Sequence, residues 1–344
     1  MKLKGTWFGV VGCALLAAAP AMSGAQDRPT PADMVWLLPP APPHPADNAP
    51  SEARVALGKM LFFDPRLSRD GNMACATCHN PLLGWSDGLP TAKGFKSQVL
   101  GRASPTVVNS GYNKIQMWDG RKATLEDQAI GPMVADVEMN ADLGAIFRWL
   151  NSSEGYRAAF NRAYPGEAID EKTFSKAIAS FERTVISNDS AFDRWLKGDA
   201  RAMSAQQVRG FRLFADENKG NCATCHSAPN FTDNGFHNIG LRSYGVAQPD
   251  MGRYLIRPVA AAKGAFKTPT LRDIELTAPY FHDGSANTLM DVVEHYARGG
   301  EVKTDLSPNM KKLQLTQQEK EDLVAFMRAL TSPRKPVVLP ILPN

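Results

Sequence analysis

Cysteine is scarce in this chain of 344 residues. Of the five cysteines, Cys13 lies near the N-terminus and the other four fall in two short motifs, so none is left to form a disulfide. The excess of positive over negative charge is also small. A formal net charge of +4 gives no support for nucleic acid or an acidic membrane surface as a partner. The one long apolar run, at the N-terminus, is short for a membrane span.

That N-terminal run has the layout of a secretory signal peptide. Two lysines precede apolar residues over 7–22, and small residues follow over 23–25. The layout predicts that residues 1–25 are removed by cleavage before Gln26, and that the mature protein lies in a bacterial periplasm. Cys13 weakly resembles a lipoprotein cleavage site, but apolar residues continue past it, which favours an incidental cysteine.

The remaining cysteines form two C-x-x-C-H motifs, at residues 75–79 and 222–226. This pattern is the attachment signature of c-type haem. Two thiols a helical turn apart add to the vinyl groups of one porphyrin, and the adjoining histidine lies beneath the iron. A zinc site would need further Cys or His ligands at close spacing, which neither motif has. The sequence predicts two covalent haem c groups, one on Cys75, Cys78 and His79 and one on Cys222, Cys225 and His226.

The two halves of the chain repeat each other. The pattern Gly-x-x-Leu-Phe-x-Asp precedes each motif, at residues 58–64 and 210–216. After the motifs, Pro105 matches Pro269 at an offset of 164 residues, and this register holds without gaps as far as Leu125. Apolar residues recur at helical spacing and strand signals are few. We therefore predict a mainly α fold of two tandem cytochrome-c-like domains, each with one haem c.

Composition and periodicity also predict the domain boundaries. Residues 26–50 are Pro-rich and should form an arm with no core of its own. The first domain is assigned to residues 51–199, and the second to residues 200–344 with a Pro-rich tail. The last helix should start at a capping box, Thr316-x-x-Glu319. Helices are predicted from Ser51 and Thr124 and over residues 142–150, 154–164, 171–186, 204–216, 288–297 and 316–330.

The repeats differ at positions that bear on chemistry. Trp118 corresponds to His282, and Pro132 corresponds to Tyr296. A phenol can bind iron whereas a proline side chain cannot. If Tyr296 faces the second haem, that haem has two protein ligands and the first has one, because no histidine lies between His79 and Trp118 to close the first site. The sequence therefore predicts one saturated, electron-transferring haem and one open, reactive haem.

These motifs resemble those of the bacterial di-haem cytochrome c peroxidases, and particularly of their MauG-like branch. In the peroxidases the position of Tyr296 is a methionine, whereas in the MauG-like branch it is a tyrosine. The resemblance thus implies a low-potential second haem, since a phenolate stabilises oxidised iron. Met310 lies in a plausible region and stays open as an alternative ligand. The resemblance covers nearly all of the mature chain and rests on both C-x-x-C-H motifs and on residues 117–121, 137–139, 237–240 and 279–284.

The resemblance also implies roles for three further side chains. Glu138 and Gln128 correspond to the pair that handles peroxide above the first haem. A carboxylate there can take a proton from one peroxide oxygen and return it to the other, while the amide orients by hydrogen bonding. Trp118 corresponds to a tryptophan that relays electrons between the haems. The distal histidine of the reductively activated peroxidases is absent from the 80–117 loop, so prior half-reduction should be unnecessary.

A calcium ion between the domains is a further implication of the resemblance. Its ligands would include the backbone carbonyls of Thr277 and Pro279. The family's asparagine ligand is replaced here by Ala103, so the sequence leaves open whether calcium binds. In MauG a surface tryptophan two residues before the second motif passes oxidation to a partner protein. Gly220 stands at that position here, which argues against this route.

Together these features predict a periplasmic enzyme that reduces hydrogen peroxide to water. Its electrons would come from a small redox protein, such as a cytochrome c or a cupredoxin. One alternative is a MauG-like oxidase that modifies Trp or Tyr side chains of a partner protein. A second, non-enzymatic alternative is a di-haem electron-transfer cytochrome, which predicts two six-coordinate haems and no reaction with peroxide.

Overall fold

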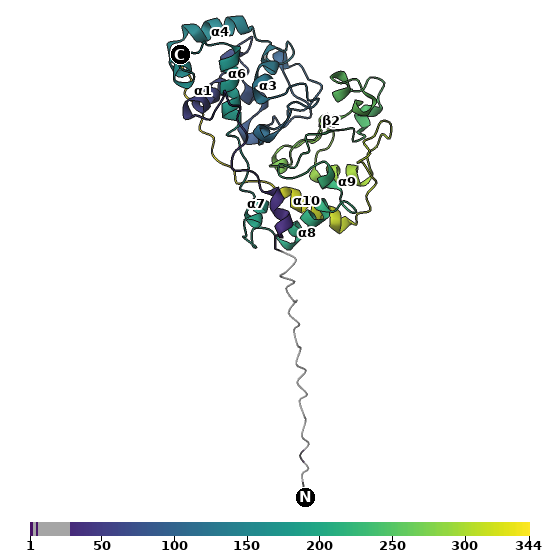
Figure 1. The fold of residues 1–344 in the computed structure, drawn as a ribbon. Helices are drawn as coiled ribbons and strands as arrows, with labels where there is room; N and C mark the ends of the chain where they lie inside the picture. The colour runs from purple at the N-terminus through teal and green to yellow at the C-terminus, as the bar shows by residue number, and fades with distance from the viewer. Residues whose placement is uncertain (3–4, 6–27) are drawn as a thin grey trace.

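The computed structural model describes residues 1–2, 5 and 28–344. The predicted signal peptide, with Cys13, falls almost wholly outside the described residues. The rest forms two helical bodies, one holding α1 to α6 and the other α7 to α10 (Figure 1). Strands among the described residues are limited to the short pair β1 (Phe236–His237) and β2 (Phe266–Lys267). The prediction of a mainly α fold with two tandem domains is confirmed.

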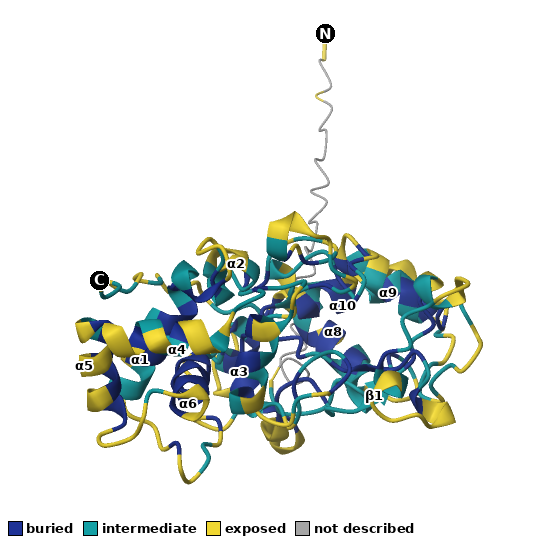
Figure 2. Ribbon diagram, turned by 90° about the horizontal axis from the view of Figure 1, so that it is seen from above, coloured by how far each residue is buried: buried dark blue, intermediate teal, exposed yellow. Residues whose placement is uncertain are grey.

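The first half is organised by the crossing of α1 (Glu52–Phe63) and α6 (Glu171–Glu182). Gly58 lies at the crossing, where any side chain would overlap the carbonyl oxygen of Ala177, so the two backbones can meet closely only at a glycine. Both helices contribute buried apolar residues to the first core, and Figure 2 colours the ribbon by the burial of each residue. The other helices of this half are α2 (Cys75–Cys78), α3 (Leu125–Val134), α4 (Leu143–Ser152) and α5 (Glu154–Ala163).

The second half repeats this crossing with α8 (Ala205–Ala215) and α10 (Gln317–Arg328). Gly210 lies against the carbonyl oxygen of Asp322, as Gly58 does in the first half. The predicted capping box is present, since the Thr316 hydroxyl accepts from the Glu319 amide at 3.3 Å and the Glu319 carboxylate accepts from the Thr316 amide at 2.8 Å. This half is completed by α7 (Ala191–Leu196) and α9 (Leu289–Ala297).

Ten short 3-10 helices lie among the described residues and connect these elements. They are η1 (Pro31–Trp36), η2 (Pro65–Leu67), η3 (Pro81–Leu83), η4 (Phe95–Ser97), η5 (Ser110–Tyr112), η6 (Cys222–Thr224), η7 (Arg242–Gly245), η8 (Arg253–Leu255), η9 (Ala260–Ala262) and η10 (Ile274–Leu276). The sequence analysis did not expect η1, which lies in the Pro-rich arm. Phe192 and Trp195 of α7 lie in the second core, although the sequence-based division places them in the first domain.

One predicted helix is shorter than expected. The periodicity predicts a helix to Ile186, but α6 ends at Glu182. Beyond it the chain turns, so that the Val185 carbonyl accepts from the Asn109 amide at 2.9 Å and the Ser187 amide donates to the Asn109 side chain at 3.0 Å. These bonds to a distant loop replace the helical ones, which explains why periodicity alone overestimates the helix.

The two halves repeat in three dimensions at the predicted offset of 164 residues. The helices α3 and α9 begin after Thr124 and Thr288, whose hydroxyls accept from the amides three residues on. Before these helices, Met117 and Phe281 adopt the same left-handed backbone conformation, with φ of 70° and 71°. The repeat is therefore a repeat of backbone geometry as well as of residue type.

The halves contact each other in the manner of a symmetric dimer. The Ala103 amide donates to the His282 carbonyl at 2.7 Å, and the Lys267 amide donates to the Trp118 carbonyl at 2.7 Å. Ala103 and Lys267 are equivalent in the repeat, as are Trp118 and His282. Each half thus presents the same backbone groups to the other, which is the property of an isologous interface.

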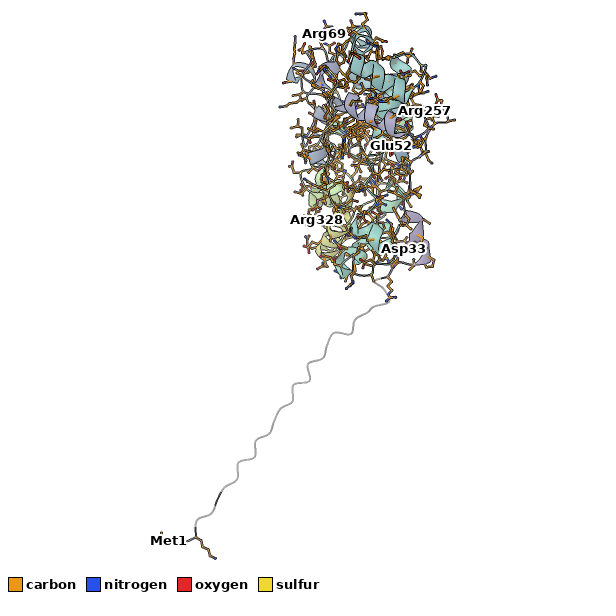
Figure 3. All side chains as sticks on the ribbon, turned by 90° about the vertical axis from the view of Figure 1, so that its left-hand side faces the viewer. Met1, Asp33, Glu52, Arg69, Arg257 and Arg328 are labelled. Carbon is orange, nitrogen blue, oxygen red and sulfur yellow. The ribbon has the colours of Figure 1, made fainter. Side chains whose placement is uncertain are left out.

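The N-terminal arm, residues 28–50, packs onto both halves. Trp36 is buried in the second core, with ring centroids 4.7 Å from Phe231 and 5.9 Å from Phe211. Asn48 is fully buried in the first half, where its side chain donates to the Lys176 carbonyl at 3.0 Å. Asp33 lies at one end of the molecule, far from the start of α1 (Figure 3).

The C-terminal tail crosses in the same direction. It leaves α10 in the second half and ends beside α4 in the first (Figure 1). The Pro343 carbonyl accepts from the Arg66 guanidinium at 2.8 Å, and the Asn344 carbonyl accepts from the Ser153 hydroxyl at 2.7 Å. Both chain ends therefore connect the two halves.

Candidate functional site

The first C-x-x-C-H motif forms the single helical turn α2. The His79 amide donates to the Cys75 carbonyl at 2.9 Å, which places the thiols of Cys75 and Cys78 on the same side of the turn as the imidazole. The Nδ1 atom of His79 lies 3.3 Å from the Trp85 carbonyl oxygen, a hydrogen bond that requires a proton on Nδ1. The other ring nitrogen, Nε2, is then unprotonated and available to a metal.

Glu138 lies beside this motif, as the resemblance implied. Its carboxylate raises the pKa of the Cys78 thiol, together with burial and Asp87, so the two groups are close. Burial raises the pKa of Glu138 itself, and the guanidinium of Arg121 only partly offsets this. The Glu138 carboxyl forms no hydrogen bond with another described residue. A half-buried carboxyl of raised pKa, with no protein partner, is suited to exchanging protons with a ligand.

Gln128 and Pro132 lie on α3, one turn apart, and Glu138 is in the turn that follows the helix. The Glu138 amide donates to the Ala135 carbonyl at 3.0 Å, which fixes this turn. The Gln128 amide group is half-buried and forms no hydrogen bond with a described residue. No hydrogen bond joins the side chains of Gln128 and Glu138.

The second motif has the same local geometry. The His226 amide donates to the Cys222 carbonyl at 2.9 Å, and Nδ1 of His226 lies 3.0 Å from the Phe231 carbonyl oxygen. Phe231 follows the second motif much as Trp85 follows the first, and both residues have positive φ. His226 therefore also presents Nε2 for metal binding.

Tyr296 projects from α9 toward the second motif. Burial raises the pKa of its hydroxyl well above the ordinary value, and so do the neighbouring thiols of Cys225 and Cys222. No hydrogen bond engages this hydroxyl within the described part of the chain. The phenol therefore lies near the second motif, its role as an iron ligand stays a prediction, and Pro132 occupies the equivalent place on α3.

The loop that contains Met310 also borders the second motif. Asn309 donates to the Cys225 sulfur at 3.7 Å and accepts through its carbonyl from Asn221 at 2.9 Å. Met310 is half-buried here, so the structure leaves both candidate ligands near the motif. His295 is different, because its Nε2 lies 2.9 Å from the Ile239 carbonyl oxygen and is engaged there.

Trp118 lies between the halves. Its indole nitrogen donates to the Ala103 carbonyl at 2.9 Å, and its ring meets His282 edge to face at 6.3 Å between centroids. His282 in turn stacks on Phe266 at 3.5 Å, and burial lowers the pKa of His282 to about 4. The aromatic groups of this boundary are therefore packed and uncharged near neutral pH.

The donor set at each motif fits a covalently bound haem c. Each motif offers two thiols that are free of disulfides and an imidazole with Nε2 available. Aromatic side chains pack around the first motif, including Phe62 and Trp85 at 6.0 Å between centroids. Thiols for the two vinyl groups and one axial nitrogen are what haem c requires.

Other metal sites find less support. Among the described residues, one group of three has ligand atoms close enough for a metal ion, namely Cys225, Asp233 and His237. It contains a cysteine of the second motif, and His237 is already held by Asp233 at 2.8 Å and by the Ser307 hydroxyl at 3.1 Å. Calcium at the carbonyls of Thr277 and Pro279 stays a prediction.

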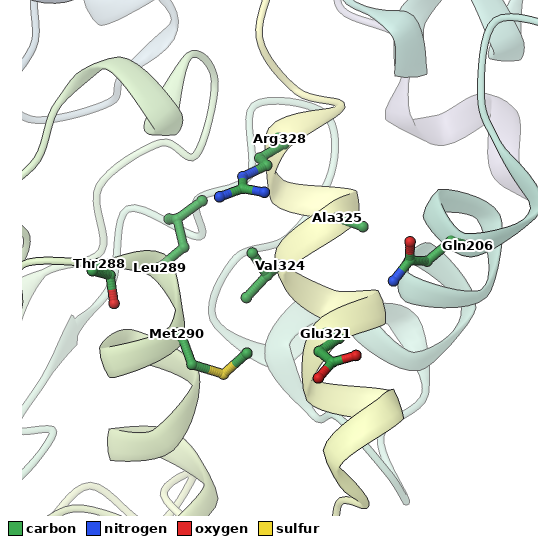
Figure 4. Close-up of a pocket in the computed structure, with 8 residues that line it drawn as sticks. All are labelled: Gln206, Thr288, Leu289, Met290, Glu321, Val324, Ala325 and Arg328. Carbon is green, nitrogen blue, oxygen red and sulfur yellow. The ribbon is translucent and has the colours of Figure 1, made fainter.

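A surface pocket lies away from both motifs. Its volume is about 380 Å³, and it is bordered by α8, α9 and α10 (Figure 4). Met290 and Val324 form its apolar part, and Glu321 and Arg328 its charged rim. None of the predicted site residues lines it.

Comparison with known proteins decides the family. A family model described as di-haem cytochrome c peroxidase matches residues 52–201, and one described as cytochrome c matches residues 207–331. The methylamine utilization protein MauG of Methylorubrum extorquens is 42% identical over 100% of this chain and 96% of that protein. This chain belongs to the di-haem cytochrome c peroxidase and MauG family. The resemblance inferred from the motifs is confirmed, and a di-haem family implies two haem c groups.

Other members of the family show the same relationship. Cytochrome c551 peroxidase of Pseudomonas aeruginosa is 36% identical over 85% of this chain and 83% of that protein. The crystal structure of a MauG-like protein associated with microbial copper homeostasis matches with a TM-score of 0.80 and 32% identity, over 86% of this chain and 95% of that one. Relatives thus include both peroxidases and MauG, which are oxidoreductases. No helix among the described residues is long and apolar enough to cross a membrane.

Sequence reasoning missed one residue near the first motif. Glu182, at the end of α6, is a buried acid whose carboxylate raises the pKa of the Cys75 thiol. A lone glutamate at the end of a predicted helix gives no sign of burial. The internal repeat could have revealed it. Aligning Phe181 with Phe326 pairs Glu182 with Met327, an apolar residue, which predicts a buried position for Glu182.

Proposed function

We propose that this chain is a periplasmic di-haem peroxidase that reduces hydrogen peroxide to water with electrons from a small redox protein. The first haem, on Cys75, Cys78 and His79, is the peroxide-reactive one. The second, on Cys222, Cys225 and His226 with Tyr296 as its further ligand, transfers electrons.

One observation carries this proposal, namely the asymmetry between two equivalent helices. Tyr296 on α9 lies beside the second motif, whereas Pro132 occupies the equivalent position on α3. A proline cannot ligate iron, and no histidine follows His79 before Trp118. One haem is then saturated and the other open. This asymmetry is expected of an enzyme and not of a simple electron carrier.

Bound haem supplies the iron that coordinates peroxide and exchanges electrons with it. The protein's contribution is proton handling. Glu138, as a carboxylate, accepts a proton from the near oxygen of peroxide and donates it to the far oxygen, which leaves as water. The raised pKa of Glu138 helps it to hold that proton between the two steps. The side-chain amide of Gln128 forms no hydrogen bond with a described residue, so it can orient the departing oxygen by hydrogen bonding.

Trp118 provides the connection between the halves. Its backbone carbonyl accepts from Lys267, and its indole is fixed by the Ala103 carbonyl. A fixed, oxidisable indole at the boundary between the two motifs can relay electrons from the second haem to the first. The electrons themselves come from a soluble donor such as a cytochrome c or a cupredoxin.

A MauG-like oxidase that modifies side chains of a partner protein is the second candidate. The similarity to MauG over the whole chain favours it. The environment of Gly220 speaks against the route through a tryptophan at that position. Gly220 is buried, and any side chain on it would overlap the carbonyl oxygen of Leu213. Oxidation of a partner would therefore have to leave the protein elsewhere.

Low-temperature EPR of the fully oxidised protein tests the proposal first. One high-spin and one low-spin signal are expected, followed by rapid peroxide turnover with a reduced cytochrome c or cupredoxin. Two low-spin signals and no reaction with peroxide would instead indicate the electron-transfer cytochrome. Reaction with peroxide but poor turnover with every small donor, together with oxidation of a partner protein, would favour the MauG-like activity.

A further inference from the structure

Glu182 is a buried acid in the first half, at the end of α6. The residue is only 6% exposed, and its Oε2 atom is buried without a hydrogen-bond partner. The preceding residue, Phe181, packs against Phe62 and Trp85 at 5.2 Å and 6.0 Å between centroids. An ionised carboxyl without a partner is strongly disfavoured in such surroundings. Glu182 therefore keeps its proton in the structure as described.

The charged groups around Glu182 do not neutralise it. Arg183 is the nearest cation, but its guanidinium forms two bonds of 2.7 and 3.0 Å to the Glu126 carboxylate. Glu126 opposes ionisation of Glu182, and burial is the main cause that raises the pKa of Glu182 to about 8. On the side of the first motif, the group that senses Glu182 is the Cys75 thiol. The Glu182 carboxyl thus lies near two groups: the Arg183–Glu126 ion pair, whose guanidinium is already bound, and Cys75, where the haem would attach.

The internal repeat shows that this acid is specific to the first half. Gly58 lies against Ala177 and Phe181, and Gly210 lies against Asp322 and Phe326, which fixes the register of α6 and α10. In this register Glu182 is equivalent to Met327, which is also buried at 7% exposure. The position next to the second motif is therefore apolar, and the position next to the first is acidic. The methionine at the equivalent position satisfies the packing of the second half. Packing therefore does not explain why the first half has an acid there.

We propose that Glu182 is a redox-linked proton site of the first haem. With haem bound, Glu182 would take up one proton from solvent on reduction by the donor and release it on reoxidation, at pH values between the pKa of its carboxyl in the oxidised and in the reduced state. The added negative charge of reduction and the carboxylate repel each other, so the protonated acid favours the reduced state and the carboxylate favours the oxidised state. One electron and one proton move together, which keeps the buried site's charge constant.

This inference rests on the proposed haem attachment at Cys75 and Cys78, but not on the peroxidase reaction. The experiment is a redox titration of the haem-loaded protein, with the two haems followed by their optical and EPR signals, from well below to well above pH 8. A pyridine haemochrome assay first establishes two haems per chain. The midpoint potential of the first haem should fall as pH rises, and the second haem should show a weaker dependence.

The variants E182Q and E182M separate charge from packing. The glutamine keeps the shape of the side chain, and the methionine copies the second half. Both should remove most of the pH dependence of the first haem and leave the second haem unchanged. Redox-induced infrared difference spectra should also lose the band of a protonated carboxyl in E182Q. E138Q is the control, because Glu138 is, with Asp87, another acid close to this motif, and E138Q should retain both the slope and the band.

Persistence of the slope and the band in E182Q would overturn the proposal, as would their loss in E138Q alone. Should E182M fail to bind haem, E182Q still decides the question. Failure of the first motif to carry haem would be visible in the haemochrome assay, and this failure would count against the proposed function rather than against Glu182 alone.

Discussion

Trp118 and His282 occupy equivalent positions in the two repeats, and they meet edge to face with ring centroids 6.3 Å apart. The boundary between the halves therefore passes between two copies of one ancestral position, one of which became an indole and the other an imidazole. Only the indole is readily oxidised. The backbone at the boundary is thus symmetric between the halves, whereas the two side chains at its centre differ in how easily they are oxidised.

The variant W118F should slow electron transfer between the haems while leaving both EPR signals in place. Phenylalanine keeps an aromatic ring at the boundary but is much harder to oxidise and lacks the nitrogen that donates to the Ala103 carbonyl. Rapid-freeze EPR after mixing the half-reduced protein with peroxide measures the rate. W149F is the matched control, since Trp149 is half-buried on α4 and meets Tyr156 edge to face. Equal rates in W118F and wild type would remove Trp118 from the pathway.

The variant E138Q should slow the reaction of the oxidised protein with peroxide by about 10²–10⁴-fold, the usual contribution of a general acid–base. Because Glu138 must be ionised to accept a proton and burial raises its pKa, the wild-type rate should fall at acid pH, with a midpoint above that of an ordinary glutamate. Stopped-flow absorbance across pH measures both effects. The acid limb should vanish in E138Q but remain in D136N, which changes an exposed carboxyl in the same turn.

Variants at Tyr296 and Met310 identify the second ligand of the second haem. Y296F should convert its low-spin EPR signal to high-spin, because phenylalanine cannot bind iron. Y296M should keep the low-spin signal and raise the potential, since thioether sulfur favours reduced iron more than a phenolate does. M310L should change neither. The opposite pattern, with the low-spin signal lost only in M310L, would assign the ligand to Met310.

Replacing Trp36 with alanine should destabilise the second half by about 3–5 kcal/mol, the usual cost of removing a buried aromatic side chain. Trp36 is 7% exposed and its ring contacts Phe211, Phe214 and Phe231. Chemical denaturation monitored at the second haem measures the loss. V35A, a change at the adjacent residue with 62% exposure, is the control and should have little effect. A similar loss in both variants would show that the arm is not anchored through Trp36.

Local features were predicted well from the sequence. The helices that begin at Ser51, Thr124, Thr288 and Thr316 were found because each has its own N-terminal cap. The two haem motifs are likewise contained in five residues each, so their local geometry is not set by distant segments. The offset of the repeat then identified Tyr296 and Pro132 as equivalent residues from the sequence alone.

Features that depend on distant segments were not predicted. Trp36 lies in a Pro-rich stretch with no periodicity, and only the second core, whose other residues lie at positions 192–330, makes it a buried residue. The early end of α6 depends on bonds to Asn109 in another loop. The meeting of Trp118 with His282 arises from how the halves associate, which a repeat in sequence does not specify.

The anchoring of Trp36 has a consequence for the order in which the molecule assembles. Trp36 is made early in synthesis, yet its ring contacts Phe211 and Phe214 of α8 and Phe231, which are made much later. The tail adds the reverse constraint, because its last residues bind Arg66 and Ser153 in the half made first. The first half can acquire its core during synthesis, but its two ends are secured only after the whole chain has emerged. Removal of residues 343–344 would leave Arg66 and Ser153 without these two bonds between the halves.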